Sequence, residues 1–304
     1  MNNNVPVLRK DIFDEVLRVF NLPVSGFTRA LLAPVFGVPV NRFAKIGSEF
    51  DRTTAMHGFR QAAKKLLPHF IEKISVSGEE NIPKEGPLLL VANHPGAYDS
   101  LAISACIPRS DYKIVVGNIK FLKLLPNTSD NLIFSYHKDQ TQARANVVRS
   151  SIQHLKQGGS LLIFPSGRVD PDPAVQPGTL QSLMKWSRSV AIMLREAPQT
   201  KLLITFVSGV LDNRLMNNPL LFLQREEWER RRLAEFIQVI RQLLLKGRRI
   251  PHTQVSFTPP IETGIWEGLQ DTRKVMEGIQ AHASELFIEC MGYWKKRINS
   301  YFQP

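Results

Sequence analysis

Short apolar runs alternate with helical stretches after residue 74, and this pattern constrains the fold more than any other feature of the chain. Six runs have the length and composition of strands, at residues 88–92, 112–116, 131–135, 160–164, 201–207 and 253–258. Several lack in/out alternation, as expected for strands covered on both faces. Helices fit between them at about 100–107, 141–156, 180–196, 226–245 and 271–290. The pattern predicts an α/β fold, a mostly parallel mixed sheet with helices on both faces.

The first 74 residues have a different, helical pattern. Apolar residues recur at three- and four-residue intervals between Asp11 and about Ile74, and we expect Pro23, Pro34 and Pro39 to divide this region into short helices. We therefore predict an N-terminal helical segment, 1–74, ahead of an α/β domain, 75–304. The longest uncharged apolar stretch, 30–40, is far short of the roughly 20 residues that cross a bilayer. It can dip into a membrane surface or pack on its own domain.

The balance of charge predicts an anionic partner. The 304-residue chain has 39 Lys and Arg against 27 Asp and Glu, a net charge of +12 and a pI near 9.8. Nucleic acid, anionic lipid and phosphorylated small molecules all satisfy that requirement. Nucleic acid is the weakest of the three, because aromatic residues are not interleaved with the basic ones as a stacking platform needs.

Cysteine and histidine spacing predicts neither disulfides nor a metal. Cys106 and Cys290 form no disulfide framework or metal motif, which fits a reducing cytoplasm, and the start of the chain lacks the order of a signal peptide. The histidines other than His94 show no metal-ligand spacing, so we expect no metal and no resident cofactor. We expect a cytoplasmic protein, peripheral on the inner face of the membrane.

A titratable pair follows the predicted strand 88–92. Pro95 and Gly96 cannot extend a strand, so the chain turns after His94 and a helix begins near Ala97, with Asp99 in its first turn. If Asp99 accepts a hydrogen bond from Nδ1 of His94, Nε2 is free to take a proton from a substrate hydroxyl. The alternative is that Asp99 only caps the helix and that His94 binds a backbone carbonyl.

A second motif, Phe164-Pro165-Ser166-Gly167-Arg168, closes another predicted strand. In a parallel sheet the two strands can end at the same edge. Gly167 allows backbone N–H groups to approach an anion, and Arg168 supplies a fixed positive charge. One edge of the sheet would then hold both a base and an anion site.

The two motifs together resemble those of the glycerolipid acyltransferase family, which includes the lysophosphatidic acid acyltransferases. Asn93, His94 and Asp99 match the family's Asn-His-x-x-x-x-Asp, and Phe164, Pro165 and Gly167 match its Phe-Pro-Glu-Gly. The resemblance covers roughly residues 74–261. It implies a glycerol-3-phosphate acyltransferase-like fold, with catalysis by His94 and Asp99 and substrate binding by Asn93 and the second motif.

This sequence departs from the family pattern at several positions. Ser166 stands where the family usually has Glu, Arg168-Val169 replaces the common Thr-Arg, and Lys138 occupies the place of an acceptor-binding Arg. A branch of the family tolerates Ala or Ser at the Glu position, so Ser166 does not argue against activity. It weakens the case for glycerol phosphate or lysophosphatidate as acceptor. Lys138 and Arg168 could hold a phosphate or carboxylate, or could be solvated surface cations.

Two basic, amphipathic segments allow two interpretations each. Residues 117–127 contain Lys120, Phe121, Leu122 and Lys123, and the resemblance places them near the acyl chain, whereas the sequence alone allows a plain amphipathic turn. Residues 225–249 form an amphipathic helix that covers a sheet or holds the protein on anionic lipid.

We predict an acyltransferase that moves a fatty acyl group from acyl-CoA or acyl carrier protein to a hydroxyl or amine of a lysophospholipid, glycerolipid or other lipid-like acceptor. Its partners are then the thioester donor, the lipid acceptor and an anionic membrane surface, without nucleic acid. The rival prediction is a catalytically inactive lipid-binding or scaffold protein of the same fold, suggested by Ser166 and Lys138.

Overall fold

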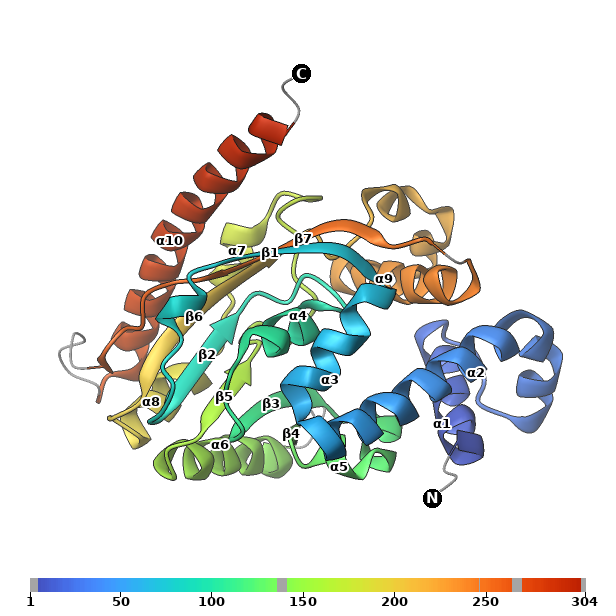
Figure 1. Cartoon of the computed structure of the whole chain (residues 1–304), viewed down its shortest axis with the longest axis horizontal. Coiled ribbons are helices and arrows are strands. Elements are labelled where there is room, and N and C mark those ends of the chain that lie inside the picture. The colour runs from blue at the N-terminus through green and yellow to red at the C-terminus, as the bar shows by residue number, and fades with distance from the viewer. Residues whose placement is uncertain (1–4, 136–140, 246, 264–269, 302–304) are drawn as a thin grey trace.

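A computed structural model describes residues 5–135, 141–245, 247–263 and 270–301. A twisted sheet lies at the centre, with the N-terminal helices at one end and the last helix along the opposite side (Figure 1). The strands are β1 (Ile71–Ser77), β2 (Leu88–Ala92), β3 (Tyr112–Gly117), β4 (Leu132–Ser135), β5 (Ser160–Ile163), β6 (Lys201–Ser208) and β7 (Ile250–Phe257). The α-helices are α1 (Val5–Val19), α2 (Gly26–His57), α3 (Phe59–Leu66), α4 (Asp99–Cys106), α5 (Pro126–Ser129), α6 (Thr141–Lys156), α7 (Thr179–Leu183), α8 (Ser189–Glu196), α9 (Glu227–Leu244) and α10 (Thr272–Tyr301). Short 3-10 helices include η1 (Leu67–His69), η2 (Glu79–Asn81), η3 (Lys120–Leu124), η4 (Asn213–Asn217) and η5 (Pro219–Leu223).

The strand order of the sheet is β1-β7-β6-β2-β5-β3-β4. Strands β2 to β6 run parallel to one another, β7 is antiparallel to β6, and β1 is parallel to β7. The sheet is therefore mixed and mostly parallel, as the sequence predicted. In the register of β2 with β5, Val91 lies opposite Ile163, so the two strands carrying the predicted motifs end side by side.

The central strands are buried on both faces. Leu88 and Leu90 of β2 belong to one core with α3 and α4, whereas Leu89 and Val91 belong to the other with α7, α8 and α10. All four side chains are fully buried. This arrangement explains why the strands read as continuous apolar runs, and it confirms helices on both faces of the sheet.

The N-terminal region is helical, but the prolines do not divide it as predicted. Helix α2 continues through Pro34 and Pro39. Each proline removes one intrahelical hydrogen bond and leaves the carbonyl four residues earlier unpaired. Those carbonyls belong to Ala30 and Val35, which are exposed, so the surroundings can satisfy them. The helix instead ends at Gly58, whose φ of 81° favours glycine.

Two other elements differ from the prediction. Residues 71–74 were expected to end the helical region, but they form the first part of the edge strand β1, which pairs with β7. The expected helix 180–196 is two shorter helices, α7 and α8. Both differences arise in short segments where strand pairing or local turns outweigh helical periodicity. The division of the chain into two domains at residue 74 stays a prediction.

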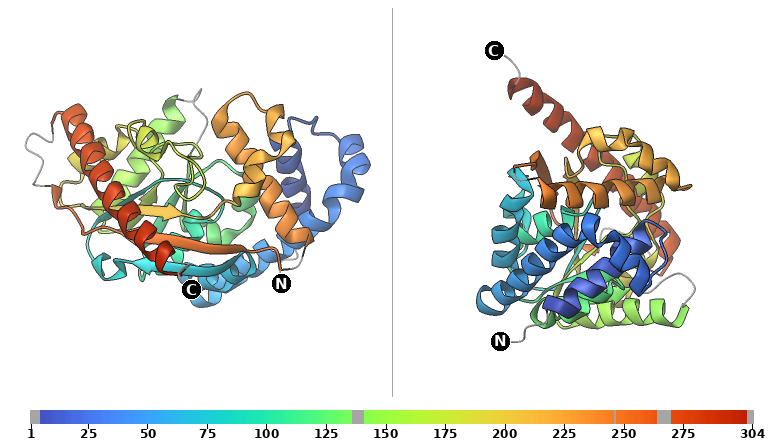
Figure 2. Two further views of the ribbon diagram at one scale, coloured as in Figure 1. Left: turned by 90° about the horizontal axis from the view of Figure 1, so that it is seen from above. Right: turned by 90° about the vertical axis from the view of Figure 1, so that its right-hand side faces the viewer.

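The N-terminal helices pack on the rest of the molecule through apolar and charged contacts. Leu8 and Leu17 of α1 and Val40 of α2 form a core of their own, which Phe121 and Leu122 of η3 also join. Arg232 of α9 makes an ion pair of 3.0 Å with Glu15 of α1. Helix α9 therefore lies beside the N-terminal helices at the same end of the molecule (Figure 2).

Candidate active site

His94 and Asp99 meet in the loop that leaves β2. The chain turns at Pro95 and Gly96, and Asp99 is the first residue of α4. Oδ2 of Asp99 lies 2.7 Å from Nδ1 of His94 and also accepts the N–H of Gly96 at 3.1 Å. Asp99 is completely buried, whereas 30% of the His94 side chain is exposed. With Nδ1 donating to the carboxylate, Nε2 of His94 is the nitrogen that can take a proton.

Asn93 fixes the end of the strand before this loop. Its side chain is buried and pairs twice with the backbone of Val207 on β6, donating from Nδ2 to the carbonyl at 2.9 Å and accepting the N–H on Oδ1 at 2.8 Å. The amide continues the hydrogen-bond ladder beyond the last residue of β2, so it positions His94. A direct contact between Asn93 and substrate stays a prediction.

The second motif reaches the same place. The rings of Phe164 and His94 are stacked, with centroids 4.5 Å apart and an interplanar angle of 26°. Pro165 is buried, and Gly167 adopts a φ of 63° while its N–H donates to the carbonyl of Phe164 at 3.0 Å. Arg168 is exposed, and its guanidinium lies 5.3 Å from the ring centroid of Trp228 on α9. The structure therefore brings together the two motifs that are far apart in the sequence.

Two aspartates that the sequence analysis missed hold the site together. The N–H of His94 donates to Oδ2 of Asp170 at 2.8 Å, and the N–H of Asp170 donates to the carbonyl of His94 at 2.7 Å. Ser166 also donates to Oδ2 of Asp170, at 3.0 Å. Asp172 accepts three consecutive N–H groups after β6, those of residues 209, 210 and 211, at 2.8, 2.8 and 3.0 Å. Their only sequence signal is Asp-Pro-Asp shortly after the second motif.

Burial and acidic neighbours set the charges of the site. Burial tends to lower the pKa of His94, but the charge and hydrogen bond of Asp99, with the charges of Glu235 and Asp170, outweigh it and raise that pKa to about 9. Burial raises the pKa of Glu235, a residue of α9, to about 8. It also raises the pKa of Asp170, against the hydrogen bonds that favour its ionised form. The imidazole thus lies among three carboxyl groups that hold a proton on it.

The remaining predicted residues lie elsewhere. Lys138 is outside the described residues. Most of η3 consists of Lys120, Phe121, Leu122 and Lys123. The rings of Phe121 and Phe43 of α2 meet edge to face, with their centroids 5.6 Å apart. The Nζ atom of Lys123 lies 5.2 Å from the ring centroid of Phe134. This segment packs against the N-terminal helices, and its place beside an acyl chain stays a prediction.

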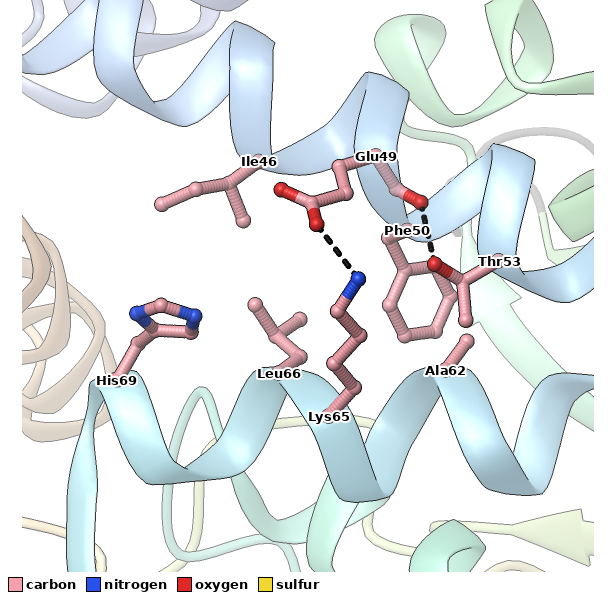
Figure 3. Close-up of a pocket in the computed structure, with 8 residues that line it drawn as sticks. All are labelled: Ile46, Glu49, Phe50, Thr53, Ala62, Lys65, Leu66 and His69. Carbon is pink, nitrogen blue, oxygen red and sulfur yellow. Dashed lines mark hydrogen bonds and ion pairs between the residues drawn. The ribbon is translucent and has the colours of Figure 1, made fainter.

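A pocket between α2 and α3 is separate from this site (Figure 3). Glu49 and Lys65 make an ion pair of 2.8 Å across it, and the bond and charge of Lys65 lower the pKa of Glu49. Its lining contains none of the predicted site residues: Ile46, Glu49, Phe50, Thr53, Ala62, Lys65, Leu66 and His69.

Within the described residues, no group of three or more His, Cys, Asp or Glu side chains is placed to hold a metal ion. In the same part of the chain, no helix has the length and apolar character needed to cross a membrane.

A buried acid that orients a partly exposed histidine, at the carboxyl end of a parallel strand, defines a class of site suited to removing a proton from a substrate. Residues 73–211, which include both motifs, match the family model Acyltransferase. Within this region the chain is similar to the acyltransferase family, and the resemblance stated above is confirmed at that level.

The chain is also similar to solved structures. Among solved structures, the chain is similar to the 1-acyl-sn-glycerophosphate (LPA) acyltransferase PlsC from Thermotoga maritima, with 16% sequence identity over 91% of this chain and 97% of that chain, and a TM-score of 0.43. A likeness at this TM-score carries no argument about substrate. No curated protein matches the sequence significantly.

Proposed function

We propose that this protein transfers a fatty acyl group from a thioester, acyl-CoA or acyl carrier protein, to a hydroxyl or amine of a lipid-like acceptor. The observation that carries the proposal is the pairing of His94 with buried Asp99 inside the region that matches the acyltransferase family. The acceptors that we propose are lysophospholipids, glycerolipids and other lipid-like molecules.

In the proposed mechanism, Nε2 of His94 takes the proton of the acceptor group as that oxygen or nitrogen attacks the thioester carbonyl. Asp99, held by backbone N–H groups, keeps Nδ1 protonated and stabilises the imidazolium that forms. The carbon–sulfur bond then breaks, and the thiolate leaves readily because a free thiol has a pKa of about 8.5. His94 returns the proton to the thiolate or to water. No acyl-enzyme is required.

The test is acyl transfer by the purified protein. Radiolabelled acyl-CoA is incubated with a lipid extract, the labelled lipid is identified, and transfer to that lipid is compared between variants. We expect His94→Ala to lower the rate at least about a hundredfold with the fold intact, because general base catalysis is worth about 10²- to 10⁴-fold. His57→Ala, which changes an exposed histidine at the end of α2, is the matched control.

Two results would contradict the proposal. Full activity of His94→Ala would remove this histidine from the mechanism. Binding of labelled lipid by the wild-type protein, without release of thiol from any donor, would favour the rival function of a non-catalytic lipid-binding protein.

We further propose that the protein reaches its substrates by binding the membrane surface with α2 and η5. Phe27, which is 77% exposed, begins an apolar row on α2 that continues with exposed Leu31, Val35 and Val38. Phe222 of η5 is 79% exposed. Helix α2 and η5 both contact α9, and α2 lies at the end of the molecule that carries the N-terminal helices (Figure 2). An apolar row of this kind can enter the lipid interface, and the net charge of +12 favours anionic lipid.

Liposome co-sedimentation tests this mode of binding. We expect binding to rise with anionic lipid, to fall with salt, and to weaken in the double variant Phe27→Ser and Leu31→Ser. Ile288→Ser, at an exposed apolar position of α10, is the control and should bind as the wild type does. Equal binding by both variants would refute attachment through α2.

A further inference from the structure

Glu235 is a buried carboxyl group, and one of its oxygens has no hydrogen-bond partner within the part of the chain that the structure describes. It is only 7% exposed, and among the described residues its Oε1 has no partner. A buried carboxyl oxygen that has lost water without gaining a hydrogen bond reduces stability by about 1–3 kcal/mol or more. Such a group needs an explanation, and a bound substrate can supply the missing hydrogen bond.

The neighbours of Glu235 on α9 show where this side chain lies. Gln238 and Gln242, three and seven residues later, share its face of the helix. Gln238 accepts the N–H of Asp212 at 2.7 Å and donates to the carbonyl of Val210 at 2.8 Å. Gln242 accepts from the hydroxyl of Tyr98 and donates to the carbonyl of Phe70 at 3.0 Å. Both glutamines thus hold α9 against the loops after β2 and β6.

Trp228, seven residues before Glu235, marks the other end of the same face. Its ring lies under the guanidinium of Arg168, in the second motif. Glu235 is therefore placed between the Arg168 turn and the loop that carries His94. A side-chain carbon built on Gly96 would lie 3.8 Å from Cγ of Glu235, so the two residues are in direct reach across the His94 turn.

We propose that the carboxyl group of Glu235 binds the acceptor substrate, accepting a hydrogen bond from a hydroxyl or amine next to the group that His94 deprotonates. The inference rests on the proposed function, and it names the acceptor's chemistry. A neutral polyol or amine head group carries an O–H or N–H donor, and that donor satisfies the unpaired oxygen. Arg232, the cation of α9 that acts on Glu235, is already paired with Glu15.

Kinetics with two matched acceptors test this contact. The probes are 1-monoacylglycerol, which offers a second hydroxyl beside the reacting one, and its 3-deoxy analogue, which lacks it. For 1-monoacylglycerol we expect Glu235→Leu to raise the acceptor KM about tenfold or more, the usual effect of losing one hydrogen bond, with the KM of acyl-CoA unchanged. The deoxy analogue should respond little to the substitution, and Glu227→Gln, an exposed acid on the same helix, should change neither.

A second measurement needs no substrate. The pKa of His94, followed by NMR in the whole protein, should fall in Glu235→Gln, because the variant removes one negative charge that faces the imidazole, and should not move in Glu227→Gln. The free energy of unfolding of Glu235→Leu should equal or exceed that of the wild type, since an unpaired buried acid is replaced by an apolar side chain.

The outcomes separate this inference from the proposed function. An unmoved pKa of His94, or an acceptor KM unchanged in Glu235→Leu while transfer continues, overturns the role of Glu235 and leaves the acyltransferase proposal standing. Absence of transfer to 1-monoacylglycerol by the wild-type protein overturns this acceptor class, and absence of transfer to every lipid of the extract overturns the proposed function itself.

Discussion

The pH dependence of acyl transfer follows from the carboxyl groups around His94. A base acts only when neutral, and Asp99, Glu235 and Asp170 raise the pKa of His94 to about 9 in the substrate-free protein. Activity should therefore rise as the pH rises. With a pKa of about 9, about 1% of the His94 imidazole is neutral at pH 7 and half is neutral at pH 9. The value of kcat/KM should therefore rise about 50-fold from pH 7 to pH 9 and level off above pH 9.

The assay must separate this titration from others. Initial rates at low acceptor concentration report the free protein, and 1-monoacylglycerol serves as acceptor because it does not ionise between pH 6 and pH 10. Product is measured by mass spectrometry after quenching, since thiol reagents respond to pH themselves. A profile that is level from about pH 7, as expected from the usual histidine pKa of about 6.5, would show that the acids do not hold the proton on His94.

Three further predictions concern the supporting residues. Asp172→Ala should lower the free energy of unfolding by about 3–5 kcal/mol in urea denaturation, because it leaves several buried N–H groups unpaired. Asp99→Asn should lower kcat about 10²-fold or more and lower the pKa of His94 measured by NMR, since the imidazolium loses its charged partner. Ser166→Glu should lower the free energy of unfolding by about 1 kcal/mol at pH 7, because the new carboxylate repels Asp170. The loss should be smaller at pH 4, where both carboxyl groups take up protons, and equal losses at both pH values would argue against this repulsion.

Ser166 illustrates how the site differs from the family pattern. Its hydroxyl donates to Asp170, and Asp170 in turn holds both backbone groups of His94. Ser166 thus belongs to the structure that positions the base. A further carboxyl group that raises the pKa of the imidazole, that of Glu235, comes from α9 rather than from the second motif.

The sequence by itself determined the strands β2 to β7, most helices, and the turns that carry His94 and Gly167. These features are local: apolar runs report burial on both faces, and Pro95, Gly96 and Gly167 restrict the backbone where they stand. The order of strands in the sheet depends on pairing between distant segments, and the sequence did not predict it. The parallel pattern was nevertheless enough to predict that the two strands carrying the motifs end at one edge.

Only the tertiary structure decided which distant groups complete the site. Asp170 and Glu235 approach His94 because the chain after β5 folds back on the β2 loop and because α9 docks across both loops. Nothing in the spacing of these acids along the chain indicates that approach. Likewise, strand pairing placed residues 71–74, which have a helical pattern, in β1, and α2 runs through two prolines. Periodicity measures how a segment buries its own side chains, whereas partners far apart in sequence are chosen by packing.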